Sequence, residues 1–450
     1  MLAASLRNEV QIMNALAPNM DHHWLPFTNN RLFKQEPQVF ARAQGVRYWT
    51  PEGREILDGS SGLFCCAAGH GRPEIADVVH RQLMTLDYTP HFQRAAPVSF
   101  EFAQRLAALL PPGLDRLFFG NSGSEAVDSA VKICLAYHRA RGQGQRSRFV
   151  SRNWAYHGVN IGGTSLAGMV NNRRDYSGVT FDTLHMRHTW SEEQRYTRGQ
   201  PESGADKADD LEDLCRLHGG ETIAAVFIEP VAGSIGTIVP PKGYLEKLRA
   251  TCDKYGILLV FDEVITGFGR TGAAFAAQEF KVTPDLITMA KALTNGAIPM
   301  SAVAVHRDIQ AAVIDAAKGD RPELFHGYTY SAHPVACAAG LAALDIYRDE
   351  GLFARGQAMS PKLLDLVFGL RNLPQVTDLR GYGMIAGIQL KPGANPGEKG
   401  SLVQRLLFDA GLHVKATGDA LIFAPAFVVE EDELARMGEV LQKVLGRGDI

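Results

Sequence analysis

The sequence predicts an α/β fold in which helices cover a mostly parallel sheet. Two continuous apolar runs, residues 223–228 (IAAVFI) and 257–261 (ILLVF), predict strands buried on both faces, because neither run alternates with polar residues. Residues 244–255 between them are amphipathic and end at Gly256, so the three segments form one βαβ unit. The 45 glycines of this 450-residue chain are typical of many tight strand-to-helix turns.

The composition is that of a globular protein. The chain is 46% hydrophobic and 21% charged, with a formal net charge of -3. These values exclude a mainly disordered, collagen-like or coiled-coil architecture. A charge balance so close to neutral predicts no binding to nucleic acid or to an anionic membrane surface. A chain of 450 residues is expected to divide into two or more domains.

The sequence contains no apolar run of the roughly 20 residues that a membrane-spanning helix needs. Its most apolar stretch, residues 335–344, is built mostly of alanine. Polar residues stand where a signal peptide would have its apolar core, namely Asn8, Glu9, Gln11 and Asn14. The six cysteines form no CxxC pair and are expected to be mostly buried. We therefore expect a reduced, cytoplasmic protein.

Further elements follow from local patterns along the chain. Residues 46–58 predict a β-hairpin, because β-forming residues flank a turn at Pro51, Glu52 and Gly53. Residues 124–142 predict a long helix that ends at Gly142. Its apolar stripe is formed by Val127, Val131, Cys134 and Leu135.

The last part of the chain is expected to pack as a smaller unit. Residues 190–210 are polar and charged and predict a surface excursion, and residues 391–400 predict another loop. Residues 431–445 place Leu434, Met437, Leu441 and Val444 on one face, which predicts a terminal helix docked on a small domain.

Chemically active residues follow three of the apolar runs. Glu229 comes directly after residues 223–228, Asp262 follows residues 257–261, and Lys291 follows an apolar stretch at 286–289. Ligands of open α/β sheets bind at the carboxyl ends of the strands. We therefore expect a lysine and two acids to meet at one edge of the sheet.

Each of these residues also has a plainer interpretation. By position alone, Lys291 is more often a solvated loop lysine. Asp262 resembles a magnesium-binding aspartate of a phosphate-hydrolysing enzyme, but that interpretation needs a G-x-x-x-x-G-K-[ST] loop, which the sequence lacks. The turn at residues 121–125 opens the long helix, where it forms either a phosphate cradle or an ordinary N-cap by Ser122 or Ser124.

Taken together, the three features favour one cofactor. A lysine at one strand end, an acid at the next and a phosphate cradle are what pyridoxal phosphate requires. The lysine binds the aldehyde, the acid keeps the pyridine nitrogen protonated, and the helix N-terminus neutralises the phosphate. Tyr156, which follows another predicted strand, is a candidate to stack on the ring, or else a half-buried core tyrosine.

Nearly the whole chain resembles the class III aminotransferases of fold type I, and in particular the ω-amino acid:pyruvate (β-alanine:pyruvate) aminotransferases. The resemblance implies a large pyridoxal-phosphate domain at residues 81–335, with a smaller α+β domain built from residues 1–80 and 336–450. The matching stretches are HHWLPFTNNR (22–31), LDGSSGLFCCAAGHGRPEI (57–75), NSGSEAVDSAVK (121–132), AYHGVNIGGTSL (155–166), VFIEPVAGS (226–234), LLVFDEVITGFGRTG (258–272), PDLITMAKALTNGAIPM (284–300) and GYTYSAHPVACAAGLAAL (327–344).

The resemblance also implies roles around the cofactor ring. Lys291 matches the lysine that holds the cofactor covalently and moves the proton, and Asp262 matches the partner of the pyridine nitrogen. Val264 and Tyr156 match the residues on the two ring faces, and Glu229 matches an acid near the ring.

Further matches concern the phosphate and the second subunit. Gly123 and Ser124, with Ser122 before them, match the phosphate cradle. Thr329 matches a phosphate ligand contributed by the other subunit, so the resemblance implies a homodimer or homotetramer. We also expect His157 to be one of the cofactor-binding residues. His70, His157, His326 and His333 show no metal spacing, so no metal site is expected.

Three residues match the substrate pocket. Phe64 and Phe92 stand where the family places aromatic side chains. Lys415 stands where close members carry an arginine that clamps a substrate carboxylate. Lysine keeps the charge of arginine but loses its bidentate fork. The plainer interpretation of Lys415 is a surface lysine.

The resemblance implies ping-pong transamination, in which a small amine donor gives its amino group and a keto acid, pyruvate, accepts it. Other class III activities remain as alternatives, among them GABA, diamine or polyamine aminotransferases, an aminomutase and a decarboxylase. A nucleotide-binding protein that uses the 121–125 turn and a non-catalytic protein that kept the fold are alternatives from other classes.

Overall fold

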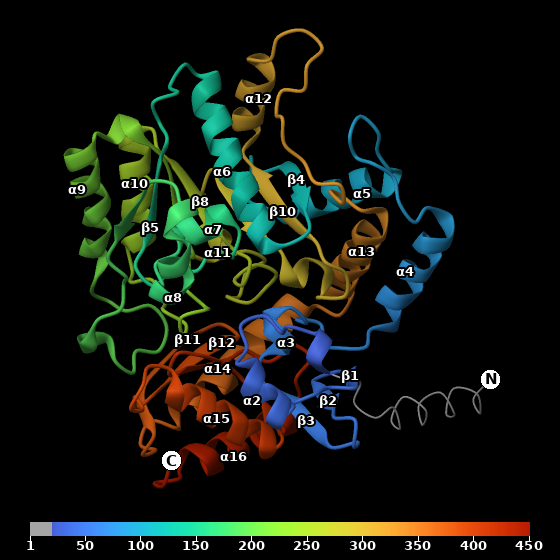
Figure 1. Ribbon diagram of the computed structural model, residues 1–450, viewed down its shortest axis with the longest axis vertical. Helices are drawn as coiled ribbons and strands as arrows, with labels where there is room; N and C mark the ends of the chain where they lie inside the picture. Colours follow the sequence, from blue (N-terminus) through green and yellow to red (C-terminus); the bar gives the residue numbers. More distant parts are fainter. Residues whose placement is uncertain (1–19) are drawn as a thin grey trace.

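The computed structural model describes residues 20–450. Figure 1 shows a larger part that holds the middle of the chain and a smaller part that combines segments from both ends. Asn8, Glu9, Gln11 and Asn14, on which the expected absence of a signal peptide rests, lie outside the described residues. Within residues 20–450, no helix has both the length and the apolar composition needed to cross a membrane.

The larger part is built on a seven-stranded sheet, and its strand directions confirm the predicted fold class. Only β10 runs antiparallel to its neighbours in this sheet, and the pairs from β9 to β6 are parallel. The predicted βαβ unit is present, since β7 and β8 pair in parallel and a helix connects them. In spatial order the strands are β4 (Arg116–Gly120), β10 (Ser301–Val305), β9 (Leu286–Met289), β8 (Leu258–Asp262), β7 (Ile223–Ile228), β5 (Arg148–Arg152) and β6 (Thr183–Met186).

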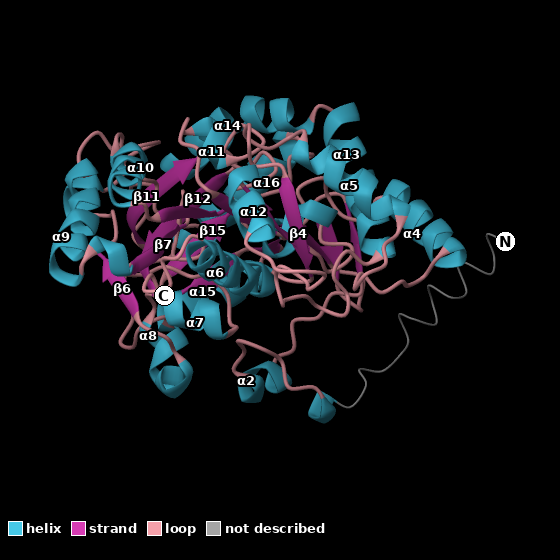
Figure 2. Cartoon of the chain, turned by 90° about the horizontal axis from the view of Figure 1, so that it is seen from above, coloured by secondary structure: helices cyan, strands magenta, loops and turns pink. Residues whose placement is uncertain are grey.

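Helices cover this sheet, as Figure 2 shows from above. Every residue of β7, β8, β9 and β10 is buried, which explains why these strands have apolar sequences without alternation. The helices of this part and its edges are α4 (Pro73–Thr85), α5 (Pro97–Ala107), α6 (Gly123–Ala140), α7 (Ile161–Leu166), α8 (Val170–Arg173), α9 (Asp209–His218), α10 (Tyr244–Tyr255), α11 (Ala276–Glu279), α12 (Arg307–Asp315) and α13 (Pro334–Asp349).

Helix α6 confirms the predicted long helix. It begins after Ser122, whose side chain accepts a hydrogen bond from the backbone N–H of Glu125, so Ser122 is the N-cap. Val127, Val131 and Cys134 are buried as predicted. Leu135 was wrongly assigned to the buried stripe, because its side chain is 36% exposed. It lies next to the stripe at the helical period of 3.6 residues and faces outward.

The smaller part contains two four-stranded sheets. The predicted hairpin is confirmed, since β2 and β3 pair in antiparallel register with Arg47 opposite Leu57. Strand β3 also pairs in parallel with β13, so the two ends of the chain share a sheet. The sheets are β1 (Arg42–Gln44), β2 (Arg47–Trp49), β3 (Glu55–Asp58) with β13 (Leu412–His413), and β11 (Val376–Tyr382), β12 (Ile385–Leu390), β15 (Ala420–Phe423) with β14 (Lys415–Thr417).

The helices of the smaller part include the predicted terminal helix, which is confirmed over residues 431–445 with its four apolar residues buried. The domain boundaries at residues 80 and 335 stay predictions; residue 335 falls inside α13, near the start of that helix. These helices are α2 (Asn30–Gln35), α3 (Ser61–Phe64), α14 (Leu352–Phe368), α15 (Glu398–Asp409) and α16 (Glu431–Leu445).

The segment at residues 190–210 runs along the surface as predicted, and it is also bonded to the smaller part of the molecule. The indole of Trp190 and the backbone N–H of Tyr196 both donate to the carboxylate of Asp378 on β11, at 3.0 and 2.7 Å. Gln194 is buried, and its side chain closes a capping box with Ser191. The predicted loop at 391–400 is shorter than expected, since α15 begins at Glu398.

Candidate active site

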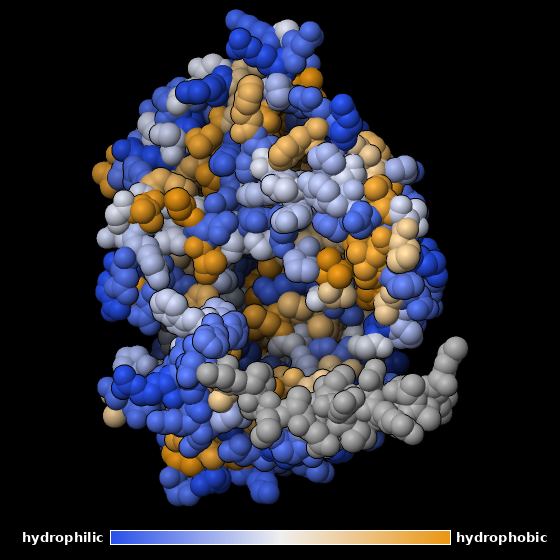
Figure 3. All heavy atoms as spheres, turned by 45° about the vertical axis from the view of Figure 1, so that its right-hand side comes forward, coloured by the Kyte–Doolittle hydropathy of each residue, from blue (hydrophilic) through white to orange (hydrophobic). Residues whose placement is uncertain are grey.

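A cleft with about 610 Å³ of empty space lies at the carboxyl ends of β5, β7, β8 and β9. Figure 3 shows a hollow in one face of the molecule with apolar side chains in its floor. The structure brings eight of the predicted site residues together in the lining of the cleft: Gly123, Ser124, Tyr156, His157, Glu229, Asp262, Val264 and Lys291.

Asp262 ends β8 and is held by three hydrogen bonds. Its Oδ2 lies 2.8 Å from Nδ1 of His157, and its Oδ1 accepts from Thr288 Oγ1 and from the backbone N–H of Val264, both at 3.2 Å. The Nε2 atom of His157 is buried and has no hydrogen-bond partner among residues 20–450. The ring proton is therefore best placed on Nδ1, where it is donated to the carboxylate. This arrangement fixes the orientation of the Asp262 carboxylate, as a pyridine-nitrogen partner requires.

Lys291 lies just past β9, in the left-handed conformation with φ of 51°. Its ε-amino group has no hydrogen-bond or ion-pair partner among residues 20–450. Burial lowers the pKa of this amine, and the charges of Cys65, Asp262 and Glu229 oppose that shift. An unpaired amine with a lowered pKa is suited to covalent bonding to an aldehyde and to accepting a proton.

The start of α6 forms a shallow cradle beside Lys291. Gly123 faces Val264 so closely that a Cβ atom on Gly123 would lie 3.1 Å from a methyl group of Val264. The hydroxyl of Ser124 accepts a hydrogen bond from the backbone N–H of Val159 at 3.1 Å. The first N–H groups of an 18-residue helix therefore open on the cleft, where they suit a phosphate. Ser122 caps the helix and is absent from the cleft lining, so the N-cap interpretation applies to it.

Glu229 follows β7 and is buried at the cleft. Its Oε1 accepts from the backbone N–H of Tyr156 at 3.1 Å. Burial raises the pKa of Glu229 to about 7, and the charge of Asp262 acts in the same direction, whereas His157 and Arg152 oppose the shift. Burial likewise raises the pKa of Tyr156, which lies half-buried in the lining.

Glu229→Gln is expected to change how the stability of the cofactor-free protein depends on pH. Between pH 4.5, the ordinary pKa, and about 7, the folded chain binds more protons than the unfolded chain, so wild-type stability falls as the pH rises. The glutamine variant lacks this loss. The melting temperature of the variant, relative to that of wild type, should therefore rise between pH 5 and 8, as measured by calorimetry. Parallel plots of melting temperature against pH for the two proteins would contradict the prediction.

The structure places the four other predicted residues outside the cleft lining. Phe64 is buried and packs in a cluster with Ile385, Ile422 and Ala424, which also contacts the cleft residue Ile265. Lys415 on β14 pairs with Ile422 of that cluster and donates its backbone N–H to Ser60 Oγ at 2.9 Å. Both residues thus lie near the cleft residue Ile265 and outside the lining itself.

Phe92 and Thr329 lie on the surface of the chain. Phe92 is 57% exposed and borders a separate groove with Phe325 and His326. Thr329 is exposed, and its backbone carbonyl accepts from the hydroxyl of Tyr88. The resemblance assigns Thr329 to the site of the other subunit, which a single chain does not test.

The sequence interpretation missed five residues of the lining, although most adjoin motifs that it used. They are Gly158, Val231, Ser234, Ile265 and Ala290. It also missed Arg270, a fully buried arginine of the GFGRTG stretch. Its guanidinium donates to the backbone carbonyls of Met384 and Pro425 and to Ser61 Oγ, so it ties the cofactor side of the cleft to the smaller part.

Comparison with known proteins agrees with this geometry. The family model "Aminotransferase class-III" matches residues 31–445. The chain is 51% identical to an omega-aminotransferase of Caulobacter vibrioides, over 96% of this chain and 99% of that protein. It is 44% identical to an omega-amino acid–pyruvate aminotransferase of Pseudomonas putida, over 95% and 96%.

A solved structure extends the match to three dimensions. The omega transaminase from Pseudomonas jessenii in complex with PMP superimposes with a TM-score of 0.90 at 31% identity, over 95% of this chain and 96% of that one. The lysine, acid and helix cradle described above fit the phosphorylated B6 cofactor of this family. The chain therefore belongs to the class III aminotransferases, enzymes that depend on pyridoxal 5′-phosphate.

Proposed function

We propose that this enzyme moves an amino group from an ω-amino acid or a related amine, with β-alanine as the type donor, to pyruvate. The observation that carries this proposal is the meeting of Lys291, Asp262 and Glu229 in one cleft, beside the opening of α6. The relatives that act on ω-amino acids or β-alanine with pyruvate are 44% and 43% identical and support the substrate class.

Each residue of the cleft is proposed to have its own role in transamination. The bound cofactor supplies an electron sink for the carbon that loses its proton. Lys291 binds the cofactor and then moves a proton at its ε-nitrogen, which its lowered pKa makes available. Asp262, held in place by His157, would stabilise the protonated pyridine nitrogen of the cofactor. Gly123 and Ser124 would hold its phosphate, and Tyr156 and Val264 would confine its ring.

Lys415 is proposed to receive the carboxylate of the donor or of pyruvate. Its ammonium has no ion-pair partner among residues 20–450, and burial lowers its pKa. A desolvated cation without an acid stabilises an incoming carboxylate more than a solvated one does. Phe64 is proposed to form part of the apolar wall next to Lys415, through the cluster that contacts Ile265.

Lys415→Met is expected to lower kcat/KM for β-alanine by roughly tenfold, because the variant keeps the length of the side chain and loses its charge. Simple amines without a carboxylate should be used as well as by wild type. A donor panel with pyruvate as acceptor measures this, and it should include GABA, putrescine and a monoamine. Lys415→Arg should shift the preference among carboxylated donors only.

The matched control is Lys391→Met, an exposed lysine of the same part of the chain. If both methionine variants changed donor preference equally, Lys415 would have no special role. Turnover of GABA or putrescine in place of β-alanine would favour another class III aminotransferase. Turnover without any keto acid would favour an aminomutase.

We further propose that the enzyme is a cytoplasmic homodimer or homotetramer in which Thr329 and Phe92 complete the site of a partner subunit. Large apolar side chains are exposed in the same region, including Met84, Phe325 and Tyr330. Such surfaces usually mark subunit contacts. Light scattering on the purified enzyme tests this proposal, and a monomer with full activity would contradict it.

A further inference from the structure

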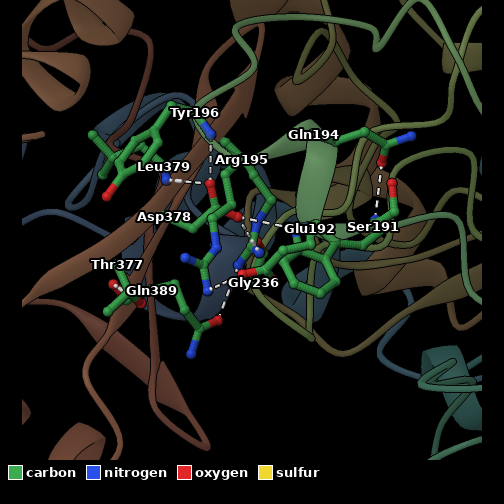
Figure 4. A network of polar contacts seen from close by, with 12 residues as sticks. Ser191, Glu192, Gln194, Arg195, Tyr196, Gly236, Thr377, Asp378, Leu379 and Gln389 are labelled. Carbon is green, nitrogen blue, oxygen red and sulfur yellow. Dashed lines mark hydrogen bonds and ion pairs between the residues drawn. The ribbon is translucent and has the colours of Figure 1, made fainter.

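A buried ion pair within β11 is the centre of a hydrogen-bond network that joins the two parts of the molecule. Arg380 and Asp378 on β11 are 6% and 1% exposed, and Arg380 Nη1 donates to Asp378 Oδ2 at 2.8 Å. The same carboxylate accepts from Trp190 and Tyr196 of the larger part. Figure 4 shows Tyr196, Gly236, Asp378 and Gln389 gathered around this network.

The guanidinium of Arg380 reaches in two further directions. Its Nε donates to the backbone carbonyl of Gly236 at 3.0 Å, and its Nη2 donates to Gln389 Oε1 at 3.1 Å. The amide of Gln389 donates in turn to the carbonyl of Asp419 at 3.0 Å. All the charge-bearing nitrogens of the side chain therefore have fixed acceptors, which a planar fork allows and an ammonium does not.

The two ends of this chain of bonds lead to the cleft wall and to the segment that carries Lys415. Gly236 belongs to the cleft loop, residues 231–238, whose Val231 and Ser234 line the cleft. Asp419 lies in the turn of the β14–β15 hairpin, which carries Lys415. Arg380 is thus a common anchor for the cleft wall and for the proposed carboxylate-binding lysine.

The backbones packed around this anchor leave little room for adjustment. A Cβ atom on Gly387 of β12 would lie 2.1 Å from the carbonyl oxygen of Gly236. A Cβ atom on Gly236 would lie 2.8 Å from the side chain of Ala420 in the hairpin. The loop and the hairpin are therefore in close contact, and a shift of one displaces the other.

We propose that Arg380 is a positioning residue for donor selectivity, because it fixes the separation between the cleft loop and the hairpin that carries Lys415. This inference rests on the proposed function, since selectivity is defined by carboxylated donors. Arg380 is not part of the cleft lining. It sets how far a carboxylate must lie from the amino group that reacts.

The main test compares Arg380→Lys with wild type. The lysine keeps the pair with Asp378 but cannot bond Gly236 and Gln389 together, so kcat/KM for β-alanine should fall roughly tenfold, mostly through KM. A monoamine without a carboxylate should lose less than about twofold. Hydrogen–deuterium exchange should quicken in residues 231–238 and 415–423 together.

A second variant distinguishes the link from Arg380 to the hairpin from its bond to the cleft loop. Gln389→Met removes the bonds that join Arg380 Nη2 to Asp419 and leaves the bond from Arg380 Nε to Gly236, so exchange should quicken in the hairpin and remain unchanged in the cleft loop. Glu433→Gln is the control, because it breaks the Arg47–Glu433 pair of 2.6 Å in the smaller part and leaves a side chain that still caps α16. This control should lower the melting temperature of the protein and leave its donor preference unchanged.

Equal losses for both donors in Arg380→Lys, or an exchange pattern like that of Glu433→Gln, would reduce Arg380 to a purely stabilising role. Unchanged exchange in both segments of Arg380→Lys would also overturn the inference. Failure of the wild type to use β-alanine would contradict the proposed function instead. The exchange pattern reports on the anchor in either case.

Discussion

Lys291→Ala is expected to abolish transamination, with a loss of roughly 10⁴-fold or more, because the variant lacks the group that transfers the proton. The purified variant should also lose the yellow absorbance of the covalently held cofactor. Its melting temperature should stay near that of the wild-type protein without cofactor, because the lost ammonium is desolvated and unpaired. Initial rates, absorbance spectra and calorimetry measure these three outcomes.

Lys281→Ala is the matched control for this variant. Lys281 is exposed, lies outside the cleft and has a φ of 55°, close to the 51° of Lys291. The two alanine substitutions therefore meet the same left-handed backbone conformation. The control should keep its colour and its rate. Full activity in Lys291→Ala would refute the assignment of Lys291.

Asp262→Asn is expected to bind the cofactor and to lose roughly 10²–10³-fold in kcat, because the neutral amide no longer stabilises a protonated ring nitrogen. The amide also disturbs the surrounding hydrogen bonds. If its nitrogen faces His157, the imidazole proton must move to Nε2, which is buried and has no acceptor. Absorbance titration measures cofactor binding, and steady-state kinetics measures the rate.

Asp285→Asn provides the comparison at the opposite end of the sheet. Asp285 precedes β9 and pairs with Arg249 at 2.7 Å, away from the cleft lining. Its loss should lower the melting temperature and leave kcat near the wild-type value. Unchanged turnover in Asp262→Asn, together with a normal cofactor spectrum, would show that Asp262 has another task.

Much of the site follows from the order of residues along the chain. Glu229, Asp262 and Lys291 each stand just after a buried run, and the ends of parallel strands meet at one edge. The same logic places Tyr156 and His157 after β5. These positions could be predicted because a residue that directly follows a parallel strand lies at the carboxyl edge of the sheet, whichever other elements pack around it.

Other residues could not be placed in this way. Phe64 and Lys415 were expected at the substrate pocket; they lie outside the lining of the cofactor cleft, next to its residue Ile265 and to Ile422, where segments distant in sequence pack together, and their role there stays a prediction. Leu135 was misassigned because an apolar residue beside a buried stripe resembles a member of it. The polar segment 190–198 gave no sign of its acceptor, because Asp378 lies about 180 residues further along the chain.

The amino-acid order by itself determined the parallel sheet, the helix that opens the phosphate cradle, and the lysine and acids at the strand ends. Each depends on periodicity or on immediate neighbours, which are local properties of the chain. Only the tertiary structure decided that β3 and β13 join the two ends of the chain, that Arg270 and Arg380 tie the parts together, and that His157 fixes Asp262. Those contacts form between side chains and backbone groups far apart in sequence, whose pairing is chosen by burial and hydrogen bonding once the sheets have packed.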